Sequence, residues 1–224
     1  MAPAVVDAGY VFVLYRRTSC GSPAERDIAS LDARELGQAQ GLSDASTRRE
    51  YVVAHALKRR LLAACLGRPP LALKFGETIR GKPILDLASC IGGNLRFSLS
   101  HASGMVGCAV AHTGEVGIDL ERWTRRIGLR VARRFLDRDK LSGFARLPRA
   151  NGARKLVQAW TEHEASLKAS GIGLSLASTS KVPASRSASF DLETHALAVA
   201  ALGEVRGIVV CEDTVSLTKL LCVD

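Results

Sequence analysis

The chain has 224 residues, of which 47% are hydrophobic and 24% charged, and its formal net charge is +9. This length can bury one sizeable core or two small ones, and the composition is typical of a globular protein. The apolar run at residues 9–15 is too short to span a membrane and lacks the basic start and small-residue cleavage site of a signal peptide. We therefore expect a cytoplasmic protein with no membrane partner. Its six cysteines show no C-x-x-C spacing, which favours buried, reduced thiols.

Along the first half, the pattern predicts a strand at residues 10–15, an irregular loop, and a long helix at residues 47–66. Ser46 is the expected N-cap, and Gly67 ends the helix. Short strands follow at residues 71–75, 94–99 and 105–112. The turn Thr113-Gly114 predicts a tight hairpin between the last of these strands and the segment 115–121.

The second half contains the same kinds of element, although the sequence shows no internal repeat. Helices are predicted at residues 129–135 and 155–170, a Ser/Ala/Thr-rich loop at 175–189, and strands at 196–202 and 207–212. The fold class expected from this mixture is α+β. We place the boundary between an N-terminal half, residues 1–112, and a C-terminal half, residues 113–224, near Thr113.

Two carboxylates share one face of the segment 115–121, whose residues alternate between apolar and polar or small. In a strand, this alternation directs Asp119 and Glu121 to one side and Leu120 to the core. On the predicted helix 155–170, Glu164 and Lys168 are four residues apart and therefore one turn apart on one face. Taken singly, such residues more often form a solvated surface. Together, Asp119, Glu121 and Glu164 would suit Mg²⁺, which prefers oxygen ligands, if the fold brought them close.

The positive charge is concentrated between residues 122 and 155. This basic segment carries twelve Lys or Arg against Asp137 and Asp139, a net charge of +10, so the remaining residues sum to −1. Such a concentration indicates either a partner with negative charge or an Arg-rich, solvated helix, and the sequence leaves both open.

Four motifs occur in order: Gly81-Lys82-Pro83, then Phe97-Ser98-Leu99-Ser100-His101, then Val116-Gly117-Ile118-Asp119-Leu120-Glu121, then the run from Trp160 through Glu164 and Lys168 to Leu174. This series resembles the 4′-phosphopantetheinyl transferases of the surfactin-synthetase-activating type, and the resemblance covers roughly residues 48 to 174. An ordered set of motifs is far more specific than any single one.

The resemblance implies two similar α+β halves related by a pseudo-twofold axis, with the active site and coenzyme A between them. It also implies Mg²⁺-dependent transfer of the 4′-phosphopantetheine arm of coenzyme A to a serine of an apo acyl- or peptidyl-carrier protein, with release of 3′,5′-adenosine bisphosphate. The basic segment would then receive the acidic carrier protein, and we expect a monomer.

The resemblance also implies roles for individual residues. Asp119, Glu121 and Glu164 match the magnesium ligands, and Glu164 and Lys168 match the catalytic pair that accepts the serine proton and steadies the leaving phosphate. The positions expected to contact the coenzyme are Lys82, Ser100, His101, His163 and, on looser spacing, Arg49. His163 departs from the lysine usual in the family, and Ser98 from the usual Asn.

Two other functions compete with this one. The first is a non-catalytic relative that binds coenzyme A or a carrier protein, suggested by His163. The second is a nucleic-acid-binding protein that uses the basic segment with Trp123, Phe135 and Phe144 as stacking aromatics, which the carboxylates argue against. We therefore expect no nucleic-acid partner.

Overall fold

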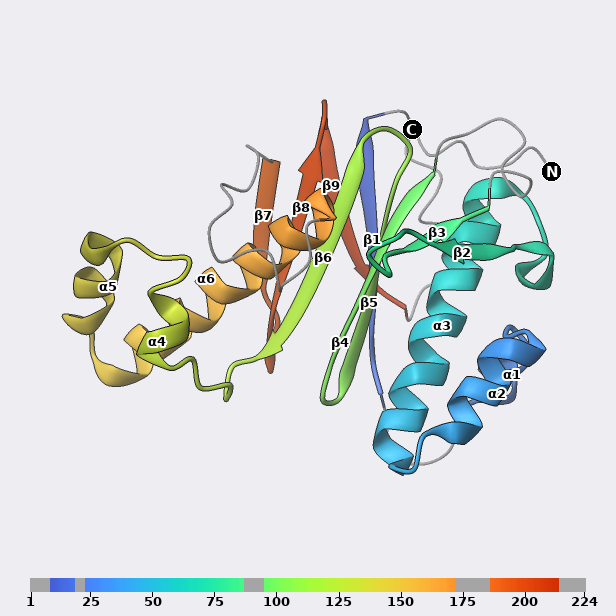
Figure 1. Cartoon of the computed structure of the whole chain (residues 1–224), viewed down its shortest axis with the longest axis horizontal. Coiled ribbons are helices and arrows are strands. Elements are labelled where there is room, and N and C mark those ends of the chain that lie inside the picture. The colour runs from blue at the N-terminus through green and yellow to red at the C-terminus, as the bar shows by residue number, and fades with distance from the viewer. Residues whose placement is uncertain (1–8, 19–22, 87–94, 172–185, 214–224) are drawn as a thin grey trace.

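The computed structural model describes residues 9–18, 23–86, 95–171 and 186–213, and these form the mixed α+β fold that the sequence predicts (Figure 1). The elements in chain order are β1 (Tyr10–Arg17), α1 (Glu25–Ile28), α2 (Ala33–Gly41), α3 (Ala45–Leu66), a 3₁₀ turn (Pro70–Ala72), β2 (Phe75–Glu77), β3 (Pro83–Leu85), β4 (Arg96–Ala102), β5 (Met105–Ala111), β6 (Glu115–Arg122), α4 (Leu129–Ala132), α5 (Arg138–Ala145), α6 (Arg149–Ser170), β7 (Arg186–Asp191), β8 (His195–Leu202) and β9 (Gly207–Glu212).

The strands form two main sheets and one small hairpin. The first sheet has the order β4-β5-β1-β9, the second has the order β6-β8-β7, and β2 pairs with β3. Every pair is antiparallel except β1 with β9, which run in parallel with Val11 opposite Ile208.

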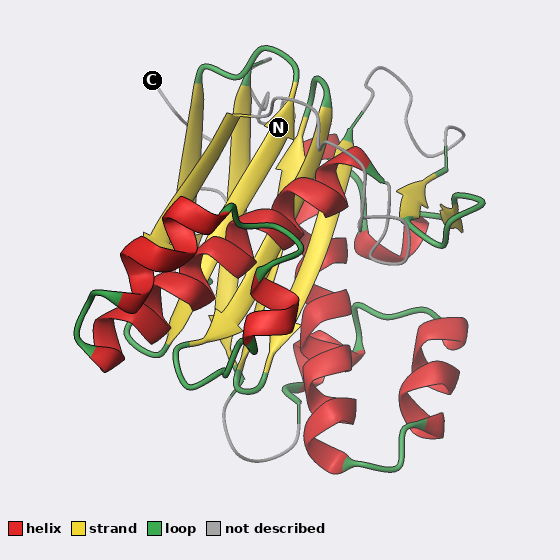
Figure 2. Ribbon diagram, turned by 60° about the vertical axis from the view of Figure 1, so that its left-hand side comes forward, coloured by secondary structure: helices red, strands yellow, loops and turns green. Residues whose placement is uncertain are grey.

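The two sheets pack face to face between two long helices, which gives four layers. Side chains of β1 and β5 that point to one side join α3 in one apolar cluster. Those that point to the other side, such as Val13 and Ala109, meet Ile118 and Leu197 of the second sheet. On the outer face of that sheet, Ala165 and Ala169 of α6 pack on Ala198 and Ala200. Figures 1 and 2 show α3 and α6 on opposite outer sides of the strands.

The predicted hairpin at Thr113-Gly114 is wrong, because β5 and β6 belong to different sheets. Gly114 has a φ of 78°, and a Cβ at this position would lie 1.8 Å from the carbonyl oxygen of Leu202. The turn therefore needs glycine in order to carry the chain from the first sheet to the second while packing against β8.

Three other segments differ from the secondary structure expected from the sequence. The irregular loop before α3 contains α1 and α2, and the N-cap of α3 is Asp44 instead of Ser46. The strand expected at residues 71–75 is a 3₁₀ turn followed by β2. A loop was expected at residues 175–189, but β7 begins at Arg186. Residues 175–185 of that loop lie outside the described residues. The chain does change sheets at residue 113, yet β9 returns to pair with β1, so the first sheet contains a strand from the C-terminal half.

A buried arginine connects α3 with the β2–β3 hairpin. Arg59 is fully buried and contacts the carboxylates of Asp32 and Glu35, and its Nη1 donates to the carbonyl oxygens of Pro70 (2.8 Å) and Leu73 (3.1 Å). These bonds fix the segment that leads into β2 and β3, and so help to place Lys82 beside the second sheet.

Among the described helices, none has the length and apolar character needed to cross a bilayer. Cys65 and Cys108 are buried free thiols, as expected, and Cys211 is a free thiol that is only half-buried; Cys20, Cys90 and Cys222 lie outside the described residues.

Candidate active site

The outward face of β6 carries the two predicted carboxylates. Val116, Ile118 and Leu120 point into the core between the sheets, so Gly117, Asp119 and Glu121 face α6, as the alternation predicts. Asp119 and Glu121 are only 5% and 9% exposed, which makes them unusual for acidic residues.

Helix α6 lies very close to β6 because residue 117 is glycine. A Cβ on Gly117 would lie 2.0 Å from the carbonyl oxygen of Ala165 and 2.4 Å from the amide nitrogen of Ala169. This contact holds the turns that carry Glu164 and Lys168 directly against the acidic strand. It also gives a physical reason for glycine two residues before Asp119.

Lys168 and Ser100 both contact one oxygen of Asp119. The Nζ of Lys168 lies 2.7 Å from Oδ1, and the Oγ of Ser100 donates to the same atom at 3.0 Å. Lys168 also donates to Ser100 at 3.1 Å. The other carboxylate oxygen, Oδ2, is buried and has no hydrogen-bond partner among the described residues.

Glu121 is held by two donors that the sequence did not suggest. Trp160 Nε1 donates to its Oε1 at 3.0 Å, and Arg125 forms an ion pair with the same oxygen at 2.6 Å. Burial raises the pKa of Glu121, and the negative charge of Asp119 raises it further.

Glu164 carries the most perturbed carboxylate of the site. Burial, followed by the charge of Asp119, raises its pKa to about 7, although Lys168 opposes the shift. Its Oε1 is also buried without a hydrogen-bond partner among the described residues. A carboxyl group of this pKa can exchange a proton near neutral pH, which is useful for a general base.

The donor chemistry of these three carboxylates fits Mg²⁺, and the two unpartnered oxygens, Asp119 Oδ2 and Glu164 Oε1, are the atoms that a cation would satisfy. They do not form a finished cage, since no three His, Cys, Asp or Glu residues of the described chain are grouped as a metal site. Lys168 and Arg125 neutralise Asp119 and Glu121 in this arrangement.

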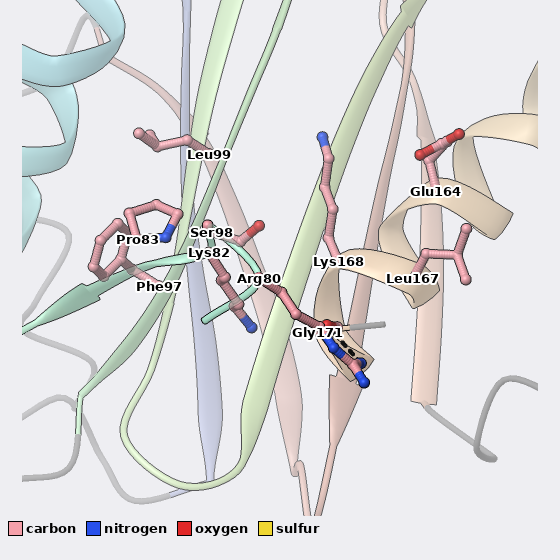
Figure 3. A pocket seen from close by; sticks show the side chains of 11 residues that line it. Arg80, Lys82, Pro83, Phe97, Ser98, Leu99, Glu164, Leu167, Lys168 and Gly171 are labelled. Atoms are coloured by element: carbon pink, nitrogen blue, oxygen red, sulfur yellow. Dashed lines mark hydrogen bonds between the residues drawn. The ribbon is translucent and has the colours of Figure 1, made fainter. Parts of the chain in front are cut away.

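Two hollows meet at this site, and Lys168 and Leu99 line both. The first, of about 450 Å³, lies between the β2–β3 hairpin, β4 and α6, and its walls include Lys82, Ser98 and Glu164. Figure 3 shows this hollow, with Arg80 reaching the carbonyl oxygen of Gly171. The second, of about 590 Å³, includes Ser100, His101, Asp119 and Glu121.

Most of the residues expected to contact the coenzyme lie around these hollows. Lys82 points to Glu115 at 2.7 Å, and His101 is exposed at the edge of the second hollow. Arg49 lines neither, but its neighbour Glu50 accepts a hydrogen bond from the Gly104 amide (2.8 Å), which places this part of α3 beside the turn after His101.

The structure does not bring His163 to these hollows. Its ring stacks on Phe135 with centroids 5.0 Å apart, and it lines a separate hollow with Lys140 and Phe144. Burial lowers the pKa of His163, which favours the neutral ring.

Comparisons with known proteins agree with this geometry. Residues 115–200, which contain β6, α6 and most of β8, match the family model of the 4′-phosphopantetheinyl transferase superfamily. Over this segment the chain is similar to the members of this superfamily. The comparisons do not test the narrower surfactin-synthetase-activating type.

Two curated relatives match over a similar stretch. The chain is 34% identical to 4′-phosphopantetheinyl transferase HetI of Nostoc sp. over 147 residues, which cover 65% of this chain and 62% of HetI. It is 27% identical over 150 residues to slr0495 of Synechocystis sp., a protein named provisionally for the same activity, with 66% of this chain and 59% of that protein covered. The matched region therefore spans less than two thirds of each relative.

Proposed function

We propose that this protein transfers the 4′-phosphopantetheine arm of coenzyme A to a serine hydroxyl of an apo acyl- or peptidyl-carrier protein and releases 3′,5′-adenosine bisphosphate. The observation that carries the proposal is the group formed by buried Asp119 and Glu164 with half-buried Lys168, in a chain whose residues 115–200 match the transferase superfamily. It combines a candidate base, a cation and two unpartnered carboxylate oxygens between two hollows.

In this proposal Glu164 accepts the proton of the attacking serine, and its pKa of about 7 in the metal-free protein makes it a stronger base there than an ordinary carboxylate. Lys168 moves from Asp119 to the phosphate that leaves with the adenosine. As a compact cation on a flexible stem, it suits a phosphate whose charge grows as the P–O bond breaks.

Asp119, Glu121 and Glu164 would hold Mg²⁺, which would neutralise negative charge on the pyrophosphate of coenzyme A. The unpartnered oxygens of Asp119 and Glu164 support this role. Lys82 and His101 are proposed to contact the coenzyme phosphates from the β2–β3 hairpin and the end of β4. Arg49 is proposed for the same purpose from α3. The division into halves at residue 113 and the pseudo-twofold axis also remain proposals.

We further propose that the acidic carrier protein docks on the basic segment, residues 122–155. This segment contains α4, α5 and the start of α6, and Figure 1 shows α4 and α5 at the left, at one end of α6. We expect the protein to carry out this reaction as a monomer in the cytoplasm.

The test is to incubate the protein with coenzyme A, Mg²⁺ and a panel of apo-carrier proteins, and to weigh the carriers by mass spectrometry. We expect one carrier to gain the mass of a single phosphopantetheine arm while an equal amount of 3′,5′-adenosine bisphosphate appears. Binding of coenzyme A without transfer to any carrier would instead support the non-catalytic relative.

A further inference from the structure

The outward face of β6 carries a third carboxylate besides Asp119 and Glu121. Glu115 lies four residues before Asp119 on the strand, so it faces the same side. Each of these three carboxylates pairs with a cation from a different part of the chain: Glu115 with Lys82 of the β2–β3 turn, Asp119 with Lys168 of α6, and Glu121 with Arg125 after β6. The last two pairs belong to the candidate active site, whereas Glu115 lies at the other end of the row.

Glu115 connects two cations from different elements. Its Oε2 accepts from Lys82 Nζ at 2.7 Å, and its Oε1 accepts from Arg96 Nε at 2.9 Å, so each oxygen has its own donor. Lys82 Nζ also lies 3.5 Å from the carbonyl oxygen of Val116, and the Lys82 side chain is only 17% exposed. Burial raises the pKa of Glu115, but Lys82 and Arg96 together bring it below its ordinary value, so the carboxylate is charged at neutral pH.

The β2–β3 hairpin depends on contacts of this kind. An isolated two-stranded hairpin is at best marginally stable in water. The base of this hairpin is held by Phe75, whose ring packs edge-on against Phe97 with centroids 5.7 Å apart. At its turn end, the shortest polar contact to another element among the described residues is that of Lys82 with Glu115, compared with 3.4 Å from Arg80 to the carbonyl oxygen of Gly171. The same turn forms one wall of the first hollow.

We infer that Glu115 is a positioning residue, which holds Lys82 and the turn end of the hairpin at the first hollow and thereby strengthens the binding of coenzyme A. The identity of the ligand rests on the proposed function, whereas the anchoring of the hairpin does not. Simple electrostatics predicts the opposite effect on binding, because a carboxylate near a polyanionic ligand repels it. Glu115→Gln therefore separates positioning from charge: positioning predicts weaker binding of coenzyme A, and charge alone predicts tighter binding.

Glu77 provides a matched control on the same hairpin. It pairs with Arg34 at 3.6 Å, both side chains are more than half exposed, and Glu77 does not line the hollow. Exposed pairs of this kind contribute little to stability. Glu77→Gln makes the same change of charge and shape as Glu115→Gln without releasing the turn.

Amide hydrogen exchange tests the anchoring without any ligand. The Gly81 amide donates to the carbonyl oxygen of Thr78 at 2.8 Å, and the Lys82 amide donates to the hydroxyl of Thr78 at 3.0 Å. In Glu115→Gln both amides should exchange about threefold faster or more, and in Glu77→Gln they should keep the wild-type rate. Glu115→Ala replaces Glu115→Gln if that variant does not fold. Unchanged exchange at both amides in a folded variant overturns the inference.

Calorimetry with coenzyme A tests the effect on binding. In Glu115→Gln we expect the Kd to rise about fivefold or more, and in Glu77→Gln to stay within about twofold of wild type. If Glu115 acts through Lys82, Glu115→Gln should add less than about twofold to the Kd of Lys82→Met. A Kd for Glu115→Gln at or below the wild-type value overturns the inference, as does a full fivefold effect in the Lys82→Met background.

Turnover separates this inference from the proposed transfer. With both substrates saturating, kcat of Glu115→Gln should stay within about threefold of wild type, because Glu164 and Lys168 keep their places. A fall in kcat as large as the rise in Kd would overturn the positioning role. A wild type that binds coenzyme A but modifies no carrier contradicts the proposed function alone, since hydrogen exchange and the Kd still decide the role of Glu115.

Discussion

At the scale of single residues, the site places negative charge where burial disfavours it. Glu164 illustrates the cost, since its folded pKa of about 7 lies above the ordinary value of 4.5. The folded protein therefore holds this proton more tightly than the unfolded chain does. The stability gained from the proton is full below pH 4.5 and is lost as the pH rises through 7.

Glu164→Gln should consequently raise the stability of the metal-free protein at pH 8 by about 1 to 3 kcal/mol, while stability at pH 4.5 changes little. Urea unfolding at the two pH values measures the difference. Glu204→Gln is the control, because it removes the same charge from an exposed position away from the site. A Glu164→Gln protein less stable than wild type at pH 8 would refute this view of the carboxylate.

Added Mg²⁺ should stabilise the wild type more than it stabilises Glu164→Gln. If the unpartnered oxygens of Asp119 and Glu164 hold the ion, added Mg²⁺ should raise the melting temperature of the wild type. It should have a much smaller effect on Glu164→Gln. Equal shifts in both proteins, measured by calorimetry with Ca²⁺ and Na⁺ in parallel, would place the ion elsewhere.

His163 should be dispensable for coenzyme binding. Its ring stacks on Phe135 outside the two hollows, so His163→Phe preserves an aromatic stack and should keep the KM for coenzyme A within about twofold. We also expect an unchanged pH profile of kcat/KM. A tenfold rise in KM for coenzyme A would instead assign His163 to the phosphate site.

The helix pattern already indicated that His163 points away from Glu164 and Lys168. Glu164 and Lys168 are four residues apart and share a face, but consecutive residues such as His163 and Glu164 point about 100° apart around a helix. Matching position 163 to the lysine of the family motif does not take this difference in direction into account. The same reasoning did predict the outward pair Asp119 and Glu121 on β6, which the structure bears out.

At the scale of elements, the close contact between α6 and β6 holds together the side chains that we propose to be catalytic. Gly117→Ala should force α6 away, because the new Cβ would meet backbone atoms at 2.0 and 2.4 Å. We expect a loss of about 1 to 3 kcal/mol in the free energy of unfolding and a larger relative loss of kcat than of coenzyme affinity.

Gly143→Ala is the matched control for this substitution. Gly143 lies inside α5, and a Cβ there would meet nothing within 4 Å. It should stabilise the protein by about 0.5 to 1 kcal/mol, because alanine favours the helix. Gly117→Ala with the stability and kcat of wild type would mean that the contact is not needed.

The sequence predicted the long elements well and the connections poorly. α3 and α6 show helical spacing over many residues, and β6 alternates throughout. The pairing of β9 with β1 and the passage of the chain between sheets at Gly114 depend on contacts between distant segments. No local pattern contains such contacts. The hydrogen bonds between β4 side chains and β6 amides were missed for the same reason, although the alternation of Ser98 and Ser100 was visible.

At the scale of the whole molecule, charge should guide the carrier protein to the site. Arg130 and Arg133 are exposed on and beside α4, and reversing both to Glu should raise the KM for the carrier several-fold and flatten its salt dependence. Arg125 is kept because it pairs with Glu121. The KM for coenzyme A should change much less.

Arg26→Glu with Arg34→Glu is the charge-matched control, since both residues are exposed near α1 and α2, away from the basic segment. This variant should leave the carrier KM near the wild-type value. Equal effects of the two double variants would indicate a general influence of net charge and would remove the basic segment as the docking surface.

The central claim is that the group formed by Asp119, Lys168 and Glu164 moves the phosphopantetheine arm. Its most direct test is a single-turnover reaction with an accepted apo-carrier, coenzyme A and Mg²⁺, followed by the intact mass of the carrier for the wild type and Glu164→Gln. The account predicts that the wild type adds one arm to one serine and that folded Glu164→Gln adds it at least a hundredfold more slowly. Transfer by Glu164→Gln at the wild-type rate would contradict it.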